Sequence, residues 1–123
     1  MDAVPEKSIE SYRQGLARRM LAEEVELEAR FQEAWAVAKS AADYLYANYD
    51  VAEVYLFGSL VHRDLFHRRS DIDLAVKGLP ARDYYRAVSN LLNLSNTFSF
   101  DLVLFEEAAP SLQACIAKEG IHL

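Results

Sequence analysis

The chain has 123 residues, of which 52% are hydrophobic and 26% charged, and its formal net charge is −6. This length and composition fit one soluble globular domain, and the negative charge argues against direct binding of nucleic acid over a broad surface. Cys115 is the single cysteine, which excludes an internal disulfide and suits a reducing cytoplasm; no signal peptide or apolar run of membrane length is found, so we expect a cytoplasmic protein.

Residues 8–48 are predicted to form one long helix, because the stretch is rich in Ala, Glu, Leu and Arg and contains no proline. Its apolar residues recur at helical spacing in two stripes: Ile9, Tyr12, Leu16 and Met20, then Leu27, Phe31, Trp35 (or Ala34), Ala38, Ala42, Leu45 and Tyr49. So long a helix exceeds what a small domain can cover. We therefore divide the chain into an N-terminal helical extension, residues 1–50, and a core, residues 51–123.

The helix is expected to pack on the core from about Ala29 onward. Its first half, with its own apolar stripe, is expected to project and to contact a partner chain, either a different protein or a second copy. The alternative is that this half folds back as a hairpin on the core.

The segment after the helix is predicted to run strand, tight turn, helix. Val54 to Phe57 is an apolar run of strand-forming residues that stops at Gly58. Gly58 allows a tight turn and a close approach to a ligand, and Ser59 is a good N-cap for a helix over residues 60–66. A helix that begins just past a glycine turn is a ready site for an anion such as phosphate.

A second strand begins at Asp71-Ile72-Asp73 and is expected to be buried on both faces further along. Because strand side chains alternate, both carboxylates lie on one face. Two neighbouring carboxylates repel each other unless a cation lies between them. A hard divalent ion, most simply Mg²⁺, fits these oxygen ligands, so the pair next to a phosphate site indicates phosphoryl or nucleotidyl transfer.

A third carboxylate, Asp101, lies within the apolar run from Ser99 to Phe105, which is predicted to be another strand. A lone Asp in such a run is costly unless it is paired or binds a metal, so we expect it beside the first two. Further helices are predicted over residues 81–94 and 111–118, the last one capped by Gly120. The alternation predicts an α/β domain with a small mixed sheet flanked by helices.

Basic residues near this site are candidates for contacts to nucleotide phosphates. Arg63, Arg68 and Arg69 form a local positive cluster in an acidic chain, and Lys77 ends the second strand. We assign Arg63, Arg69 and Lys77 to nucleotide binding. An equally weighted alternative is that any one of these arginines simply pairs with Asp64 or another acid.

The pattern Gly58-Ser59, Asp71-Ile72-Asp73 and Asp101 resembles the nucleotidyltransferase domain of the DNA polymerase β superfamily. Together with the small size, it is similar to the minimal nucleotidyltransferases, the MntA-like antitoxins that are encoded beside HEPN-domain toxins such as HepT. The resemblance covers about residues 52–120. The spacer between Ser59 and Asp71 is one residue longer than is usual in the family, and the places of the usual arginines hold Leu60 and His62-Arg63.

The resemblance implies a polymerase-β-like core that binds ATP on Gly58 and Ser59 and a pair of Mg²⁺ ions on Asp71, Asp73 and Asp101. It implies transfer of AMP to a tyrosine hydroxyl of a HEPN-type RNase toxin, which inactivates the toxin. Two alternatives stay open: an antitoxin that acts by binding alone, and a small-molecule nucleotidyltransferase of the antibiotic-modifying kind.

Overall fold

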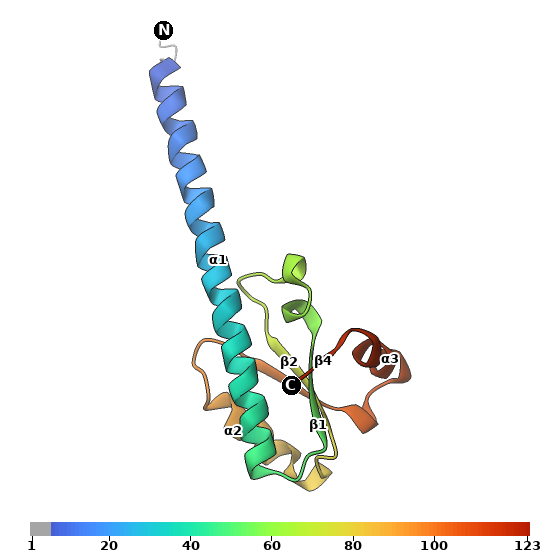
Figure 1. The fold of residues 1–123 in the computed structure, drawn as a ribbon. Coiled ribbons are helices and arrows are strands. Elements are labelled where there is room, and N and C mark those ends of the chain that lie inside the picture. Colours follow the sequence, from blue (N-terminus) through green and yellow to red (C-terminus); the bar gives the residue numbers. More distant parts are fainter. Residues whose placement is uncertain (1–5) are drawn as a thin grey trace.

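The computed structural model describes residues 6–123. A four-stranded sheet lies beside the lower part of one long helix, and two shorter helices complete the fold (Figure 1). In chain order the helices and strands are α1 (Glu6–Asn48), β1 (Glu53–Phe57), β2 (Ile72–Lys77), α2 (Tyr84–Leu92), β3 (Phe100–Leu104), α3 (Pro110–Glu119) and β4 (Ile121–His122).

The sheet has the order β3-β2-β1-β4. β1 pairs antiparallel with both β2 and β4, whereas β2 and β3 run parallel. The predicted class, an α/β fold with a small mixed sheet, is therefore confirmed. β4 was not predicted, because two residues are too few to show an alternating pattern.

The middle of β2 is buried on both faces, as the sequence predicts. Leu74, Ala75 and Val76 have no exposed surface. Ile72, Leu74 and Val76 join the main hydrophobic core under α1, and Asp73 alternates with them onto the opposite face. The central strand thus supplies the core from one face and carries a carboxylate on the other.

α1 is one continuous helix, so the hairpin alternative is wrong. Its C-terminal half packs on the sheet through a fully or almost fully buried stripe, Ala34, Ala38, Ala41, Ala42 and Leu45. Its N-terminal half projects well beyond the sheet (Figure 1). The apolar residues of this half remain exposed, with Tyr12 at 67%.

The division at residue 50 stays a prediction, and residues 1–5 of the predicted extension lie outside the described chain. In the structure, the C-terminal half of α1 supplies part of the core. No helix within residues 6–123 combines the length and the apolar character needed to cross a membrane.

The predicted helix over residues 60–66 is wrong. Two short 3-10 turns, Gly58–Leu60 and Arg63–Leu65, occupy this segment, and His62 between them is extended. The carbonyl of Leu60, which an α-helix would pair with the N–H of residue 64, instead accepts a hydrogen bond of 3.1 Å from the Trp35 indole. The anion site that we predicted at a helix N-terminus is therefore reduced to a turn.

The two later helices lie where the sequence predicts them, with different ends. A 3-10 turn over Ala81–Asp83 precedes α2. Gly120 follows α3 with a φ of −65°, so it is not the left-handed cap that we predicted. The chain stays extended after Gly120 because it continues directly into β4, which pairs with β1.

Candidate active site

Asp73 and Asp101 lie side by side on neighbouring strands. In the parallel pairing of β2 with β3, Asp73 is the direct partner of Asp101. Side chains of directly paired residues point to the same face of a sheet, so both carboxylates belong to one surface. Asp71 comes two residues before Asp73, just ahead of β2. The backbone register thus brings together the acids that the sequence singled out.

The pKa of the Asp73 carboxyl is clearly raised by this arrangement. Burial is the largest cause that raises its pKa, to about 6 from an ordinary 3.8, and the charges of Asp101 and then Asp71 add to it. A cation placed against Asp73 would stabilise the ionised form of this carboxyl.

Gly58 allows the turn after β1 to approach Asp73 closely. The last residue of β1, Phe57, pairs with Asp73, so Gly58 follows next to this carboxylate. Its φ of +81° lies in the left-handed region, and a Cβ atom at this position would overlap the Asp73 carboxylate. Only glycine therefore fits here without a shift of Asp73.

The turn that carries Ser59 is held from the helix side. The side chain of Leu60 is buried in the core, and its carbonyl is bonded to Trp35 of α1. Leu60 directly follows Ser59 and is fixed by α1. The half-buried Ser59 is therefore held at the end of β1, beside the glycine that approaches Asp73.

The carboxylate set suits a magnesium ion that a nucleotide helps to bind. Within residues 6–123, no three His, Cys, Asp or Glu side chains are arranged to hold a metal by themselves. Mg²⁺ is usually held by one or two carboxylates, with water and substrate phosphates as the remaining ligands. The paired Asp73 and Asp101, whose charges repel, match this kind of site.

The structure does not bring Arg63 or Lys77 to the carboxylates. Arg63 is bonded to Glu28 of α1, with a distance of 3.0 Å from its Nε, and lies over the Phe31 ring. Lys77 pairs with Glu53 at 3.4 Å, four residues along β2 from Asp73, which is about 13 Å at the usual rise of a strand. Their assigned roles at the phosphates stay predictions.

Arg69 is the assigned basic residue that stays close in sequence to the acids. It is exposed, and its backbone N–H donates to the Nδ1 atom of His67 at 3.1 Å, within the loop that ends at Asp71. The buried Ser70 fastens the same loop, since its hydroxyl accepts from the His67 N–H at 2.9 Å. The basic loop is thus anchored directly before the first carboxylate.

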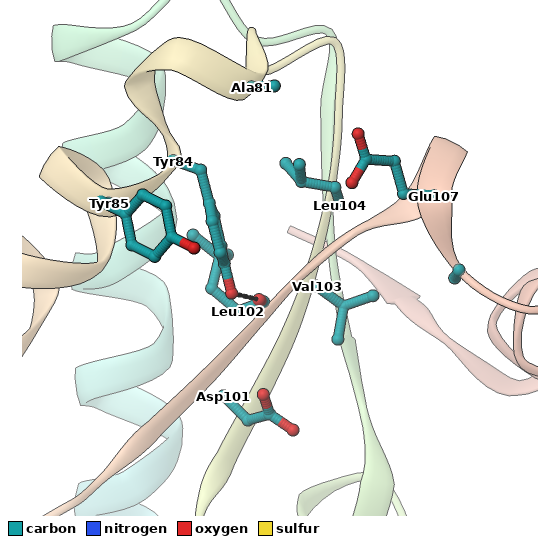
Figure 2. Close-up of a pocket in the computed structure, with 9 residues that line it drawn as sticks. Ala81, Tyr84, Tyr85, Asp101, Leu102, Val103, Leu104 and Glu107 are labelled. Carbon is teal, nitrogen blue, oxygen red and sulfur yellow. Dashed lines mark hydrogen bonds between the residues drawn. The ribbon is translucent and has the colours of Figure 1, made fainter.

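A hollow of about 490 Å³ opens beside Asp101, along the outer strand β3 (Figure 2). Tyr84 and Tyr85 of α2 form one wall, and the Tyr84 hydroxyl donates to the Leu102 carbonyl at 2.6 Å. These tyrosines are not among the site residues predicted from the sequence. Adjacent tyrosines at the start of a helix carry no local signal that separates a pocket wall from ordinary packing.

The family model described as "Polymerase beta, Nucleotidyltransferase" matches residues 39–123. The chain belongs to this family. The match includes every assigned site residue and the C-terminal end of α1, and it leaves the projecting half of that helix outside. A search of curated proteins found no match.

Solved toxin–antitoxin structures share the fold of this nucleotidyltransferase. A toxin–antitoxin structure with AMP-PNP is 26% identical, with a TM-score of 0.59 over 69% of this chain and 70% of that one. A structure of the MntA-HepT toxin–antitoxin is 22% identical (TM-score 0.54, 72% and 69% covered). A complex of tri-AMPylated Shewanella oneidensis HEPN toxin with its MNT antitoxin is also 22% identical (TM-score 0.55, 72% and 70% covered).

Replacing Gly58 with Ala should destabilise the nucleotidyltransferase. A left-handed alanine costs about 1–2 kcal/mol, and the added Cβ also displaces the Asp73 carboxylate. Urea denaturation measures the free energy of unfolding. Gly15→Ala is the matched control, because a Cβ there meets no atom within 4 Å. An equal loss in both variants would contradict the close approach of Gly58 to Asp73.

Without divalent cations, Asp73→Asn should stabilise the protein at pH 7.5 and have little effect at pH 4. The raised pKa means that ionisation of Asp73 costs more in the folded than in the unfolded state, so stability falls as the pH rises from about 4 to about 6. Water screens part of this cost at a half-buried site.

Thermal melts in EDTA check this pH dependence. A domain of this size gains roughly 3–5 °C in Tm for each kcal/mol, and we expect a gain of that order at pH 7.5. Asp43→Asn, which removes an exposed acid of α1, is the control. A gain for Asp73→Asn that is the same at both pH values would rule out repulsion between carboxylates as its cause.

Proposed function

We propose that this protein is an antitoxin that transfers AMP from ATP to a tyrosine hydroxyl of a HEPN-type RNase toxin and so inactivates it. The observation that carries the proposal is the juxtaposition of a glycine turn with paired carboxylates. Gly58 lies against Asp73, and Asp73 is in direct register with Asp101. This is the equipment for holding a triphosphate next to an acceptor hydroxyl.

The comparisons support each half of the proposal. The family is one of nucleotidyltransferases, and the 26% identical structure is a toxin–antitoxin with AMP-PNP, an ATP analogue. The Shewanella oneidensis complex contains a toxin that carries three AMP groups. From these we propose ATP as the nucleotide, AMP as the transferred group and a HEPN toxin as the partner.

In the proposed reaction the triphosphate lies on the turn of Gly58 and Ser59. The tyrosine oxygen attacks the α phosphorus and forms a new P–O bond, while the bond from that phosphorus to the bridging oxygen of the β phosphate breaks. Pyrophosphate leaves, and the Asp101 carboxylate accepts the hydroxyl proton. In this proposal Asp73, half-exposed between the turn and Asp101, lies close to the negatively charged phosphates of the nucleotide.

Asp71, Asp73 and Asp101 are the residues that we propose to hold Mg²⁺. When bound, the ions neutralise phosphate charge and lower the pKa of the acceptor hydroxyl. The chain's own part is to supply a half-buried carboxylate beside two others: burial first, and then the charges of Asp101 and Asp71, raise the pKa of Asp73, and a cation would offset both effects.

A second candidate function is neutralisation by binding alone. It is favoured by the observation that, in the part of the chain that the structure describes, no three potential ligands form a metal site by themselves. In that case the partner would be bound but not modified.

The projecting half of α1 is the surface that we propose for contact with the toxin. Ile9, Leu16 and Met20 expose 41%, 40% and 55% of their surface and share the helix face that is buried further along. Exposed apolar patches of this kind often mark sites where another chain binds and buries the apolar surface. A second copy of this protein is the other chain that could cover it.

The purified protein should add whole AMP units to the toxin encoded beside it when incubated with Mg-ATP. Intact mass spectrometry of the toxin measures the gain. Asp73→Asn should abolish the gain because it removes the carboxylate between the turn and Asp101, while the folded protein and its complex remain.

The outcomes separate the two candidate functions. A mass gain that is retained in Asp73→Asn would contradict the assigned site. If the toxin gains no mass with the unaltered protein and still forms a stable complex with it on a sizing column, binding alone accounts for the neutralisation and transfer does not occur.

Replacing Leu16 and Met20 together with Glu should weaken the complex at least about tenfold, because charge replaces the apolar surface that the partner buries. The measurement is a titration of the toxin by calorimetry. The control is Arg18→Glu, on the opposite face of the same projecting half. Unchanged affinity of the apolar-to-Glu variant would exclude this surface, and sedimentation of the antitoxin alone tests for a second copy.

A further inference from the structure

The hollow along β3 has no part in the binding of phosphate described so far. β3 is the outer strand of the sheet, with β2 on one side and, within the described chain, no strand on the other. The hollow of about 490 Å³ follows this outer edge, and Asp101 lies at one end of it (Figure 2). Its volume falls in the range of specific binding pockets.

The order of groups across the sheet gives the hollow a place in the reaction. Gly58 follows β1, Asp73 is on β2 and Asp101 is on β3, in direct register. β2 lies between β1 and β3, so the turn after β1 and the hollow along β3 lie on opposite sides of Asp73. Neighbouring strands are about 4.8 Å apart. In phosphoryl transfer the attacking and leaving oxygens lie roughly in line. With pyrophosphate on the β1 side, the acceptor therefore enters from the β3 side.

We infer that this hollow is the acceptor site, and that it receives a tyrosine of the protein substrate with a basic residue close by in the same segment. The inference rests on the proposed function and names where its acceptor binds. Asp101, at one end of the hollow, then faces the hydroxyl that must lose its proton.

The walls of the hollow match an aromatic side chain. The Tyr84 ring is fixed by its hydrogen bond to the Leu102 carbonyl, at 2.6 Å. The Tyr85 ring lies 5.3 Å from it, between centroids, and exposes 82% of its surface. One ring is thus held by the edge of the sheet while its neighbour is open to solvent. An incoming aromatic ring can pack on Tyr85 in an offset or edge-on arrangement.

The charges of the hollow favour a basic residue close to the acceptor tyrosine. Its lining includes the carboxylates of Asp101 and Glu107, and none of the described residues that line it is basic. An Arg or Lys near the acceptor tyrosine meets Glu107 favourably.

The test compares two exposed residues of α2. Tyr85→Ala should lower kcat/KM for the toxin by roughly 3- to 10-fold, mainly through KM, the range expected for loss of an aromatic contact. AMP-PNP binding and thermal stability should stay unchanged. Leu92→Ala is the matched control, because Leu92 is 51% exposed on the same helix but does not line the hollow.

A second pair of variants tests the charge. Glu107→Lys should raise KM for the toxin, whereas Glu33→Lys, the same change at an exposed site on α1, should not. If Tyr85→Ala instead weakens AMP-PNP binding, the hollow holds the nucleotide base and the inference is overturned. A normal KM in both Tyr85→Ala and Glu107→Lys also overturns it. Absence of transfer by the unaltered protein is a separate failure, which removes the proposed function and this inference with it.

Discussion

The register of β2 between its two neighbours is the constraint on which the site depends. β2 pairs antiparallel with β1 and parallel with β3, and both pairings meet at Asp73. A slip of one residue in either pairing would turn the side chains of that strand to the other face. Because the alternate residues Ile72 and Leu74 are fully buried in the core, such a slip is strongly opposed. The hydrophobic core thus determines where the carboxylates lie.

The carboxylates themselves oppose this arrangement. The pKa of Asp73 is raised to about 6 because the fold holds it partly buried and close to two other acids. A site of this kind stores unfavourable electrostatic energy that a bound cation releases. The contacts that maintain it are apolar and lie on the far face of the sheet, so one face of β2 stabilises the fold while the other carries the acid.

The two halves of α1 differ in their surroundings. Its C-terminal half covers the sheet, and its Trp35 indole holds the turn of the site through the Leu60 carbonyl. Its N-terminal half lies outside the family match and exposes an apolar stripe. In the proposed complex, a change at the exposed end would act on partner contact, whereas a change at the packed end would act on the turn that Trp35 holds.

Much of the fold could be predicted because its signals are local. The strands around Leu56, Leu74 and Leu102 and the helix before them follow from runs of consecutive residues with the right spacing. The predicted helix over residues 60–66 failed because Trp35, far away in sequence, takes the Leu60 carbonyl that the helix would need. Arg63 could not be placed from the sequence either, since its partner Glu28 lies on α1.

The sequence by itself determined which residues are candidates for the site: a glycine-serine turn and three acids, each at the end of or within a strand pattern. Only the tertiary structure decided how they meet, which basic residues are drawn away to other acids, and that a hollow lies along β3 beside Asp101. The physical reason is that strand and helix propensities act between near neighbours in the chain. Register, pairing and pockets arise from contacts between residues that are distant in sequence.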